Sequence, residues 1–276
     1  MERALESMDC STPRRLSEGQ IMTEQQGFYS KVAEKFGGYS SGARRTTSYP
    51  QGDPEEEFDA LVHELGSATG TLLDVGCADG LNLLGVAPSF GRVDGLDLSP
   101  EMLASAERHR AASGLDHVRF AVGDASATGF PAGTFDVVTS RRGPLFPEEF
   151  RRVLRRGGSV VYLGIGERDV RTLKETFGRG QLYGRWAGTP VALEERRRLE
   201  DAGFTVDYER EFSYDEFFHT PEDLDRFLQM VPIFEDYDTA SDREAFDRYV
   251  TRATAQEGIH LARHWFVLRA QLTAGD

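Results

Sequence analysis

The sequence predicts an α/β fold with a doubly wound parallel sheet. Between residues 71 and 166, five short apolar runs follow one another: TLLDV, GRVDGLDL, HVRFAVGD, TFDVVTS and SVVYLGIG. Most of them are separated by segments with helical character, and strands that alternate with helices are typical of parallel sheets built from right-handed crossovers. The 276 residues are enough for one large domain with insertions.

Two segments come before the first strand. Residues 1–22 mix charges and contain no apolar stretch, so we expect a flexible leader that is neither a secretory signal nor an anchor. Residues 23–53 are predicted to form an N-terminal helix, with Phe28, Val32 and Phe36 at four-residue spacing, followed by a glycine-containing loop that serves as a mobile lid.

Residues 54–212 form the predicted core. A helix over 55–65 has acids in its first turn, and Ser99 is expected to cap the helix that Pro100 opens. The remaining elements expected in this core are a helix over 81–88, a helix over 148–156 closed by Gly157 and Gly158, a helix ending near Ala202, and a strand over 205–212.

The C-terminal part is predicted to complete the sheet after an insertion. Residues 213–258 are rich in aromatic and acidic side chains, and helices are expected near 221–230 and 242–254. We therefore expect a helical cap inserted at the carboxyl edge of the sheet. Residues 259–276 contain the run HLARHWFVLRAQL, which predicts the final strand of the core.

Composition excludes several classes of protein. Thirty-two basic residues against 46 acidic ones give a net charge of −14, which disfavours nucleic acid as a partner. No stretch approaches the roughly 20 apolar residues of a membrane span. The two cysteines, Cys10 and Cys77, form no disulfide framework, so a reducing compartment and a cytoplasmic location are expected.

A glycine loop after the first strand predicts a cofactor site, since ligands of open α/β sheets bind outside the carboxyl ends of the strands. The loop, DVGCADG, has G-x-x-x-G spacing and lacks the dinucleotide and P-loop signatures. Its carboxylates, Asp74 and Asp79, would repel a pyrophosphate and favour a cation. Asp97 ends the second strand, where it can bind ribose hydroxyls, and Asp124 ends the third, where it can bind an adenine amino group. These features match S-adenosylmethionine.

Four motifs in order resemble those of class I S-adenosylmethionine-dependent methyltransferases: LLDVGCADG, GLDLSPEMLASA, VGDASATGFPAGTFDVV and EEFRRVLRRGGSVV. The resemblance covers about residues 70–166 and is strongest to the small-molecule and quinone-biosynthesis group. It implies a Rossmann-like sheet of seven strands, the last antiparallel. One departure is the link ASATGFPAG, which replaces the helix between the third and fourth strands.

The same resemblance implies the residues that bind the cofactor. Those at its methionine end are Asp74, Gly76, Cys77 and Gly80; those at the ribose and adenine are Asp97, Leu98, Asp124 and Ala125. Ser140 ends the fourth strand, next to the expected position of the transferable methyl group. Cys77 is assigned no chemistry of its own, because no histidine lies near it in the sequence to activate it.

Arg141 and Arg142 follow Ser140 and are the leading candidates for substrate chemistry. They either clamp a carboxylate or phosphate of the substrate, as guanidinium groups do, or pair with acids of the cap such as Glu235 or Asp236. Both interpretations stay open on the sequence alone.

Further candidate residues are expected near the carboxyl edge of the sheet. The Arg44–Arg45 pair and Arg179 add positive charge or are simply solvated, and Tyr29 and Tyr39 belong to the expected lid. His264 and His219 are candidate proton acceptors, with His264 chosen as the catalytic one. No metal site is predicted, because the acids at 235–238 have no histidine at ligand spacing.

The sequence therefore predicts a methyltransferase that converts S-adenosylmethionine to S-adenosylhomocysteine while methylating a small, anionic molecule. One alternative is an RNA-modifying methyltransferase of the same fold, which would need a continuous basic face. Another is a non-catalytic protein that binds the cofactor and uses the cap to contact a partner. The methyl acceptor and the oligomeric state are not predicted, and no membrane association is expected.

Overall fold

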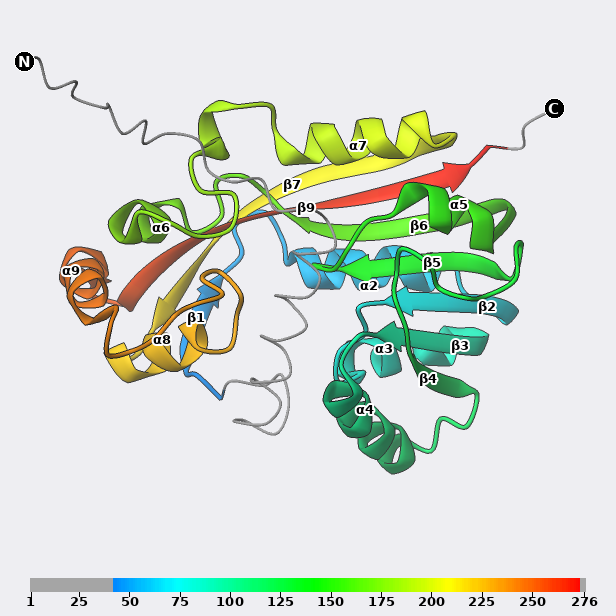
Figure 1. Cartoon of the computed structure of the whole chain (residues 1–276), viewed down its shortest axis with the longest axis horizontal. Coiled ribbons are helices and arrows are strands. Elements are labelled where there is room, and N and C mark those ends of the chain that lie inside the picture. Colours follow the sequence, from blue (N-terminus) through cyan, green and yellow to red (C-terminus); the bar gives the residue numbers. More distant parts are fainter. Residues whose placement is uncertain (1–41, 274–276) are drawn as a thin grey trace, which may run out of the picture.

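A computed structural model describes residues 42–273, which form a mixed sheet covered by helices (Figure 1). Its nine strands run in the order β1-β7-β9-β6-β5-β2-β3-β4, with β8 paired to β9. Their bounds are β1 Arg45–Ser48, β2 Ser67–Val75, β3 Phe90–Asp97, β4 Val118–Val122, β5 Phe135–Arg141, β6 Leu154–Ile165, β7 Phe204–Phe218, β8 Thr254–Ala255 and β9 Gly258–Leu272.

The expected architecture is confirmed, with two additional strands. Strands β2 to β6 pair in parallel, and β9 lies antiparallel between β6 and β7. The count of seven strands is wrong, because β1 and β8 add short antiparallel pairings to β7 and β9.

Helices cover both faces of the sheet. One face is covered by α2 Pro54–Glu64, α3 Leu81–Val86 and α4 Pro100–Ser113. The apolar side chains of these helices pack with Leu72 and Val137. The other face is covered by α5 Pro147–Val153 and α7 Val191–Asp201, which pack with Leu73 and Val138. Successive strand residues point to opposite faces, so neighbours such as Leu72 and Leu73 belong to separate cores. The doubly wound arrangement follows directly.

Local sequence signals set the helix ends. Ser99 caps α4 as expected, accepting the Met102 N–H through its hydroxyl at 3.2 Å. The expectation for Gly157 and Gly158 is wrong: α5 ends at Val153, and both glycines lie within β6.

Strands β7 and β9 are 15 residues long each and extend beyond the body of the sheet (Figure 1). Around their extension lie α6 Arg171–Phe177, α8 Pro221–Leu228 and α9 Arg243–Ala253, which share a third core with Phe218 and Leu261. We call these three helices and the segment 229–242 the cap. The sequence placed the start of the cap at residue 213, but residues 213–218 continue β7, and α6 comes from a stretch assigned to the core.

The segment expected to be a mobile lid is structured where it is described. Residues 45–48 form β1, the edge strand of the sheet, which pairs with β7 and places Arg45 opposite Phe218. The leader, the N-terminal helix and the lid candidates Tyr29 and Tyr39 lie outside the described residues. Over residues 42–273, no helix combines the length and the apolar character needed to cross a bilayer.

Candidate active site

A cavity of about 690 Å³ opens at the carboxyl ends of the parallel strands and continues beneath the cap. On the sheet side it is lined by the glycine loop after β2 and by the ends of β3 and β5; on the cap side it is lined by β1, β7, β9, α6 and the turn at 230–233. Ligand sites of this fold class lie at this edge, and the volume is in the usual range for a bound small molecule.

The glycine loop is held in a shape that brings main chain to the cavity. The N–H groups of Gly76 and Cys77 donate to the Leu96 carbonyl at 2.7 and 3.1 Å. Gly76 has a φ of +72°, which favours glycine, and it faces Pro144 and Gly143 across the cavity wall. A Cβ at Gly76 would contact Pro144 Cδ at 3.5 Å, an ordinary distance, so the preference for glycine here comes from the positive φ.

Asp97 lies at the end of β3 with both carboxylate oxygens already oriented. Its Oδ2 accepts the Ala78 N–H and its Oδ1 accepts the Ser99 N–H, both at 2.9 Å. Each carboxylate oxygen can accept a second hydrogen bond, so two hydroxyl donors such as a ribose diol fit here. Burial raises the pKa of Asp97 above its ordinary value.

Asp74 gives this half of the cavity its preference for a cation. It is buried at the end of β2, accepts a hydrogen bond from the Thr139 hydroxyl at 2.7 Å, and lines the cavity. Burial raises its pKa to about 6. A nearby positive charge would compensate the buried carboxylate, and Asp79, also buried, lines the same region.

The region expected to hold the adenine is mostly apolar. Leu98, Met102 and Ala125 line it. Asp124 does not line the cavity; its Oδ1 accepts from the Ser126 N–H and hydroxyl, both at 2.7 Å. No helix separates β4 from β5, so the short link noted in the sequence is confirmed.

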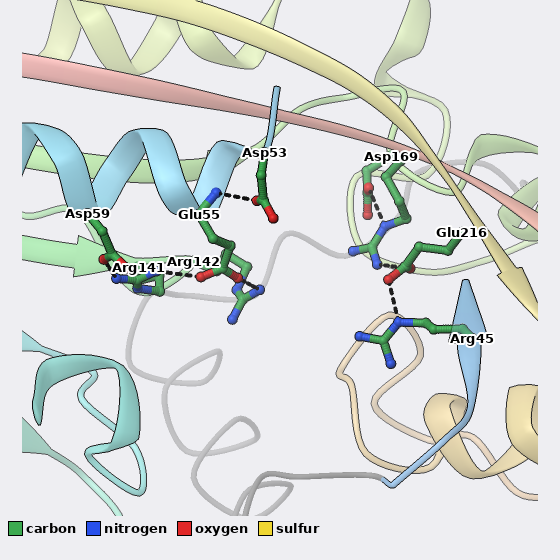
Figure 2. A network of polar contacts seen from close by, with 9 residues as sticks. Arg45, Asp53, Glu55, Asp59, Arg141, Arg142, Asp169 and Glu216 are labelled. Atoms are coloured by element: carbon green, nitrogen blue, oxygen red, sulfur yellow. Dashed lines mark hydrogen bonds and ion pairs between the residues drawn. The ribbon is translucent and has the colours of Figure 1, made fainter. Parts of the chain in front are cut away.

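Arg141 and Arg142 line the cavity but are already paired (Figure 2). Arg141 binds Glu55 and Asp59 of α2, and Arg142 binds Glu55. Their partners are therefore acids of α2, not Glu235 or Asp236 of the cap. Burial raises the pKa of Glu55, but the charges of Arg142 and Arg141 outweigh it and hold the pKa below its ordinary value.

Three other sequence candidates lie outside the lining. The Ser140 hydroxyl donates to the Pro144 carbonyl at 2.8 Å and so fixes the turn after β5. Gly80 has a φ of +74°, and a Cβ there would lie 2.7 Å from the Phe120 ring, so its requirement for glycine is structural. His264 is buried on the opposite face of β9, with its Nε2 3.0 Å from Glu211.

The remaining candidates, Arg44, His219 and Arg179, form contacts with other side chains away from the cavity. Arg44 bonds to Asp223, and the His219 ring lies 3.0 Å from the Thr46 hydroxyl. Arg179 pairs with acids of the cap, Asp236 at 3.1 Å and Asp242 at 2.9 Å. None of the three lines the cavity.

Five charged residues on the cap side line the cavity: Arg45, Asp169, Lys174, Glu216 and Arg263, here called the Arg263 network. The sequence offered Arg45 only as half of the Arg44–Arg45 pair, and the other four were missed. Figure 2 shows Arg45 of β1 pointing to Glu216 of β7, with Asp169 beyond it. Strand alternation was the available signal. Arg263 and Trp265 line the cavity, whereas His264 between them points away from it; in the same way Arg45 lines the cavity and its neighbour Arg44 does not.

Comparison with known proteins identifies the core. A family model described as "Methyltransferase domain" matches residues 72–158. Residues 72–158 form a class I S-adenosylmethionine-dependent methyltransferase domain. Its cofactor is S-adenosylmethionine, and the acids at Asp74 and Asp97 fit that ligand on chemical grounds.

Two curated relatives and one solved structure illustrate the similarity. Nocamycin O-methyltransferase of Saccharothrix syringae is 37% identical over 34% of this chain and 37% of its own length. The 2-methyl-6-phytyl-1,4-hydroquinone methyltransferase of Synechocystis is 34% identical over 45% of this chain and 42% of its own. A putative methyltransferase from Bacillus halodurans shares the fold, with a TM-score of 0.56 and 17% identity over 78% of this chain and 99% of its own.

The matched part of this methyltransferase domain spans about two fifths of the length of the two curated relatives. The cap residues from 221 onward lie outside the family match.

Proposed function

We propose that the protein transfers a methyl group from S-adenosylmethionine to a small, anionic molecule bound beneath the cap. The observation that carries this proposal is the continuity of the cavity. The same space is lined by Asp74 and Asp97 at the cofactor end and by Arg263 and Trp265 at the cap end. A cofactor and a small substrate in one continuous cavity can be aligned for direct displacement.

When bound, S-adenosylmethionine supplies an electrophilic methyl group on a sulfonium. The protein has to orient the cofactor and the acceptor relative to each other and to exclude water from the cavity. Asp97 would hold the ribose, and Asp74 would stabilise the positive charge of the methionine end. The rings of Tyr214 and Trp265, packed edge to face at 5.3 Å, form an apolar wall on the substrate side.

The charges on the substrate side support an anionic acceptor. Arg45, Arg141, Arg142, Lys174 and Arg263 line this half, against Glu55, Asp169 and Glu216. Even with Asp59, which pairs with Arg141 from outside the lining, the cations exceed the carboxylates by one. A ligand with one negative charge would balance this half of the cavity.

The alternatives are less well supported. The curated relatives that name a substrate include an O-methyltransferase of nocamycin and a methyltransferase of a phytyl hydroquinone, which are small molecules. They support a small-molecule acceptor over RNA and an enzyme over a non-catalytic binding protein.

Calorimetric titration with S-adenosylmethionine, S-adenosylhomocysteine, NAD and ATP tests the cofactor, and methyl uptake from radiolabelled S-adenosylmethionine by small acids, phenols and amines tests the reaction. We expect only the first two ligands to bind. Asp97→Ala should lose about 1.5 to 3 kcal/mol of that binding, the range for hydrogen bonds to a charged group. Asp116→Ala, at an aspartate whose side chain is almost fully exposed, is the matched control and should bind normally. Equal binding by the Asp97 variant would place the cofactor elsewhere.

A further inference from the structure

The Arg263 network is a largely buried group of charges in which the cations outnumber the carboxylates. It contains three cations, Arg45, Lys174 and Arg263, and two carboxylates, Asp169 and Glu216. Four of the five are buried, whereas Arg45 is exposed, with 34% of its side chain accessible. Buried charges are normally paired because an unpaired one is costly to remove from water. Within residues 42–273, the buried Lys174 ammonium forms no ion pair with a carboxylate, and the five groups together carry one positive charge in excess.

Its hydrogen bonds show which groups remain available. Glu216 accepts from Arg45 Nε at 2.6 Å and from Arg263 Nη1 at 2.7 Å. Asp169 accepts from Arg263 Nε at 2.9 Å and from the His264 main-chain N–H at 3.0 Å, and its own carbonyl accepts from Lys174 Nζ at 2.8 Å.

Both carboxylates are thus satisfied, whereas donors are left over. Within residues 42–273, the two Nη groups of Arg45 and the Nη2 of Arg263 have no hydrogen-bond partner, and Lys174 uses one of its three donors. The network is therefore rich in donors and poor in acceptors. An incoming carboxylate has the charge and the acceptors to complete it.

The arginines after β5 differ in this respect. Arg141 and Arg142 face two carboxylates, Glu55 and Asp59, so that cluster is balanced without a ligand (Figure 2). The position that the sequence favoured for anion binding is already neutralised by α2, and the surplus charge lies under the cap.

We propose that the Arg263 network binds a carboxylate of the methyl acceptor, so that the substrate class is a small monocarboxylic acid with an apolar or aromatic body. The Arg263 guanidinium lies 4.9 Å from the Trp265 ring and 5.8 Å from the Phe227 ring, and both rings line the cavity. The acid group then lies under the cap, and the body of the molecule extends towards the cofactor end. This inference rests on the proposed function for the identity of the ligand as the methyl acceptor.

The test uses acids paired with their primary amides, which keep the shape and remove the charge. We would titrate the full chain, saturated with S-adenosylhomocysteine, with 4-hydroxybenzoate, 4-hydroxyphenylacetate and 3-(4-hydroxyphenyl)propanoate and with the three amides. At least one acid should bind tenfold or more tightly than its amide. A series in which no acid binds more tightly than its amide overturns the proposal.

Variants locate the binding site. Lys174→Met and Arg45→Met should each weaken binding of the preferred acid tenfold or more and leave the amide within twofold. Arg171→Met is the matched control, since Arg171 is a cation on the same helix as Lys174 but bonds to Glu175 outside the cavity; it should bind the acid normally. Equal loss in the control and in Lys174→Met, or no loss in either network variant, also overturns the proposal.

Binding of S-adenosylhomocysteine separates this inference from the proposed function. Variants that retain cofactor affinity are folded, so a loss of acid binding in them reports on the network itself. If the wild-type chain binds no S-adenosylhomocysteine, the proposed function fails; if it binds the cofactor but not the acids, the carboxylate site alone fails.

Discussion

Asp74→Asn should make the protein more stable at neutral pH while weakening its cofactor binding. The Asp74 carboxylate is buried next to the cavity, and burial raises its pKa from 3.8 to about 6. The substitution keeps the shape and an oxygen to accept the Thr139 hydroxyl, but removes the charge. In the absence of cofactor the cost of burying the charge exceeds its attraction to Arg141 and Thr139, so its removal should be a net gain in stability.

The magnitude follows from the shift. From 3.8 to about 6, at about 1.4 kcal/mol per pKa unit, the buried charge costs the folded state about 3 kcal/mol above pH 6. Because the folded pKa is the higher one, this cost is absent below the unfolded pKa, grows between the unfolded and the folded pKa, and is complete above the folded pKa. The stability difference between Asp74→Asn and wild type should therefore be about 1.4 kcal/mol larger at pH 7.5 than at pH 5.

The assay is urea unfolding of both proteins at pH 5 and 7.5 without cofactor, followed by titration of each with S-adenosylmethionine. The variant should lose about 1.5 to 3 kcal/mol of cofactor binding, as expected for a lost interaction with a charged group. Asp94→Asn is the matched control: Asp94 is a buried carboxylate on β3 that pairs with Arg92 at 2.7 Å outside the cavity, and cofactor affinity should not change. A stability difference that is the same at both pH values would refute the burial argument, and unchanged affinity in Asp74→Asn would refute its role in the site.

Three further outcomes are expected. Gly80→Ala should lower the free energy of unfolding by about 1 to 3 kcal/mol in urea denaturation, since residue 80 has a φ of +74° and a Cβ would meet the Phe120 ring; unchanged stability would contradict this. Arg141→Met should destabilise the protein by about 3 kcal/mol in the same assay and raise the pKa of Glu55, because a largely buried ion pair loses one partner; a neutral effect would show that the pair is solvated. Binding of the preferred acid should weaken about tenfold per unit above pH 8, because burial lowers the Lys174 pKa to about 8 and deprotonation removes its charge; Lys174→Met should flatten this profile.

The parallel core was predictable because its signals are local. Each strand from β2 to β6 is a short apolar run, and the caps and glycines that separate strands from helices lie within a few residues of them. The cofactor end of the cavity was predictable for the same reason, because Asp74 and Asp97 lie at strand ends and parallel strands end at the same edge of the sheet. Asp124 stands at an equivalent position, but its carboxylate folds back onto Ser126.

The cap side was not predictable in the same way, because it depends on pairings between distant segments. Residues 45–48 carry no apolar run and become a strand only by pairing with β7. Glu55 and Asp59 of α2 neutralise Arg141 from about 80 residues earlier in the chain, and nothing in the local sequence of either segment indicates the contact.

Glu216 and Arg263 show why the cap side of the cavity could not be predicted from the hydrophobic pattern. Glu216 lies among the buried positions Tyr214 and Phe218 of β7, and Arg263 among Leu261 and Trp265 of β9, so each interrupts an otherwise apolar strand face. Apolar residues of similar size at such positions often give equal or greater stability than a buried ion pair. The two charges are therefore poorly explained by stability. They are explained if the face they interrupt is the wall of a binding site, and their donor surplus then specifies an acid as the ligand.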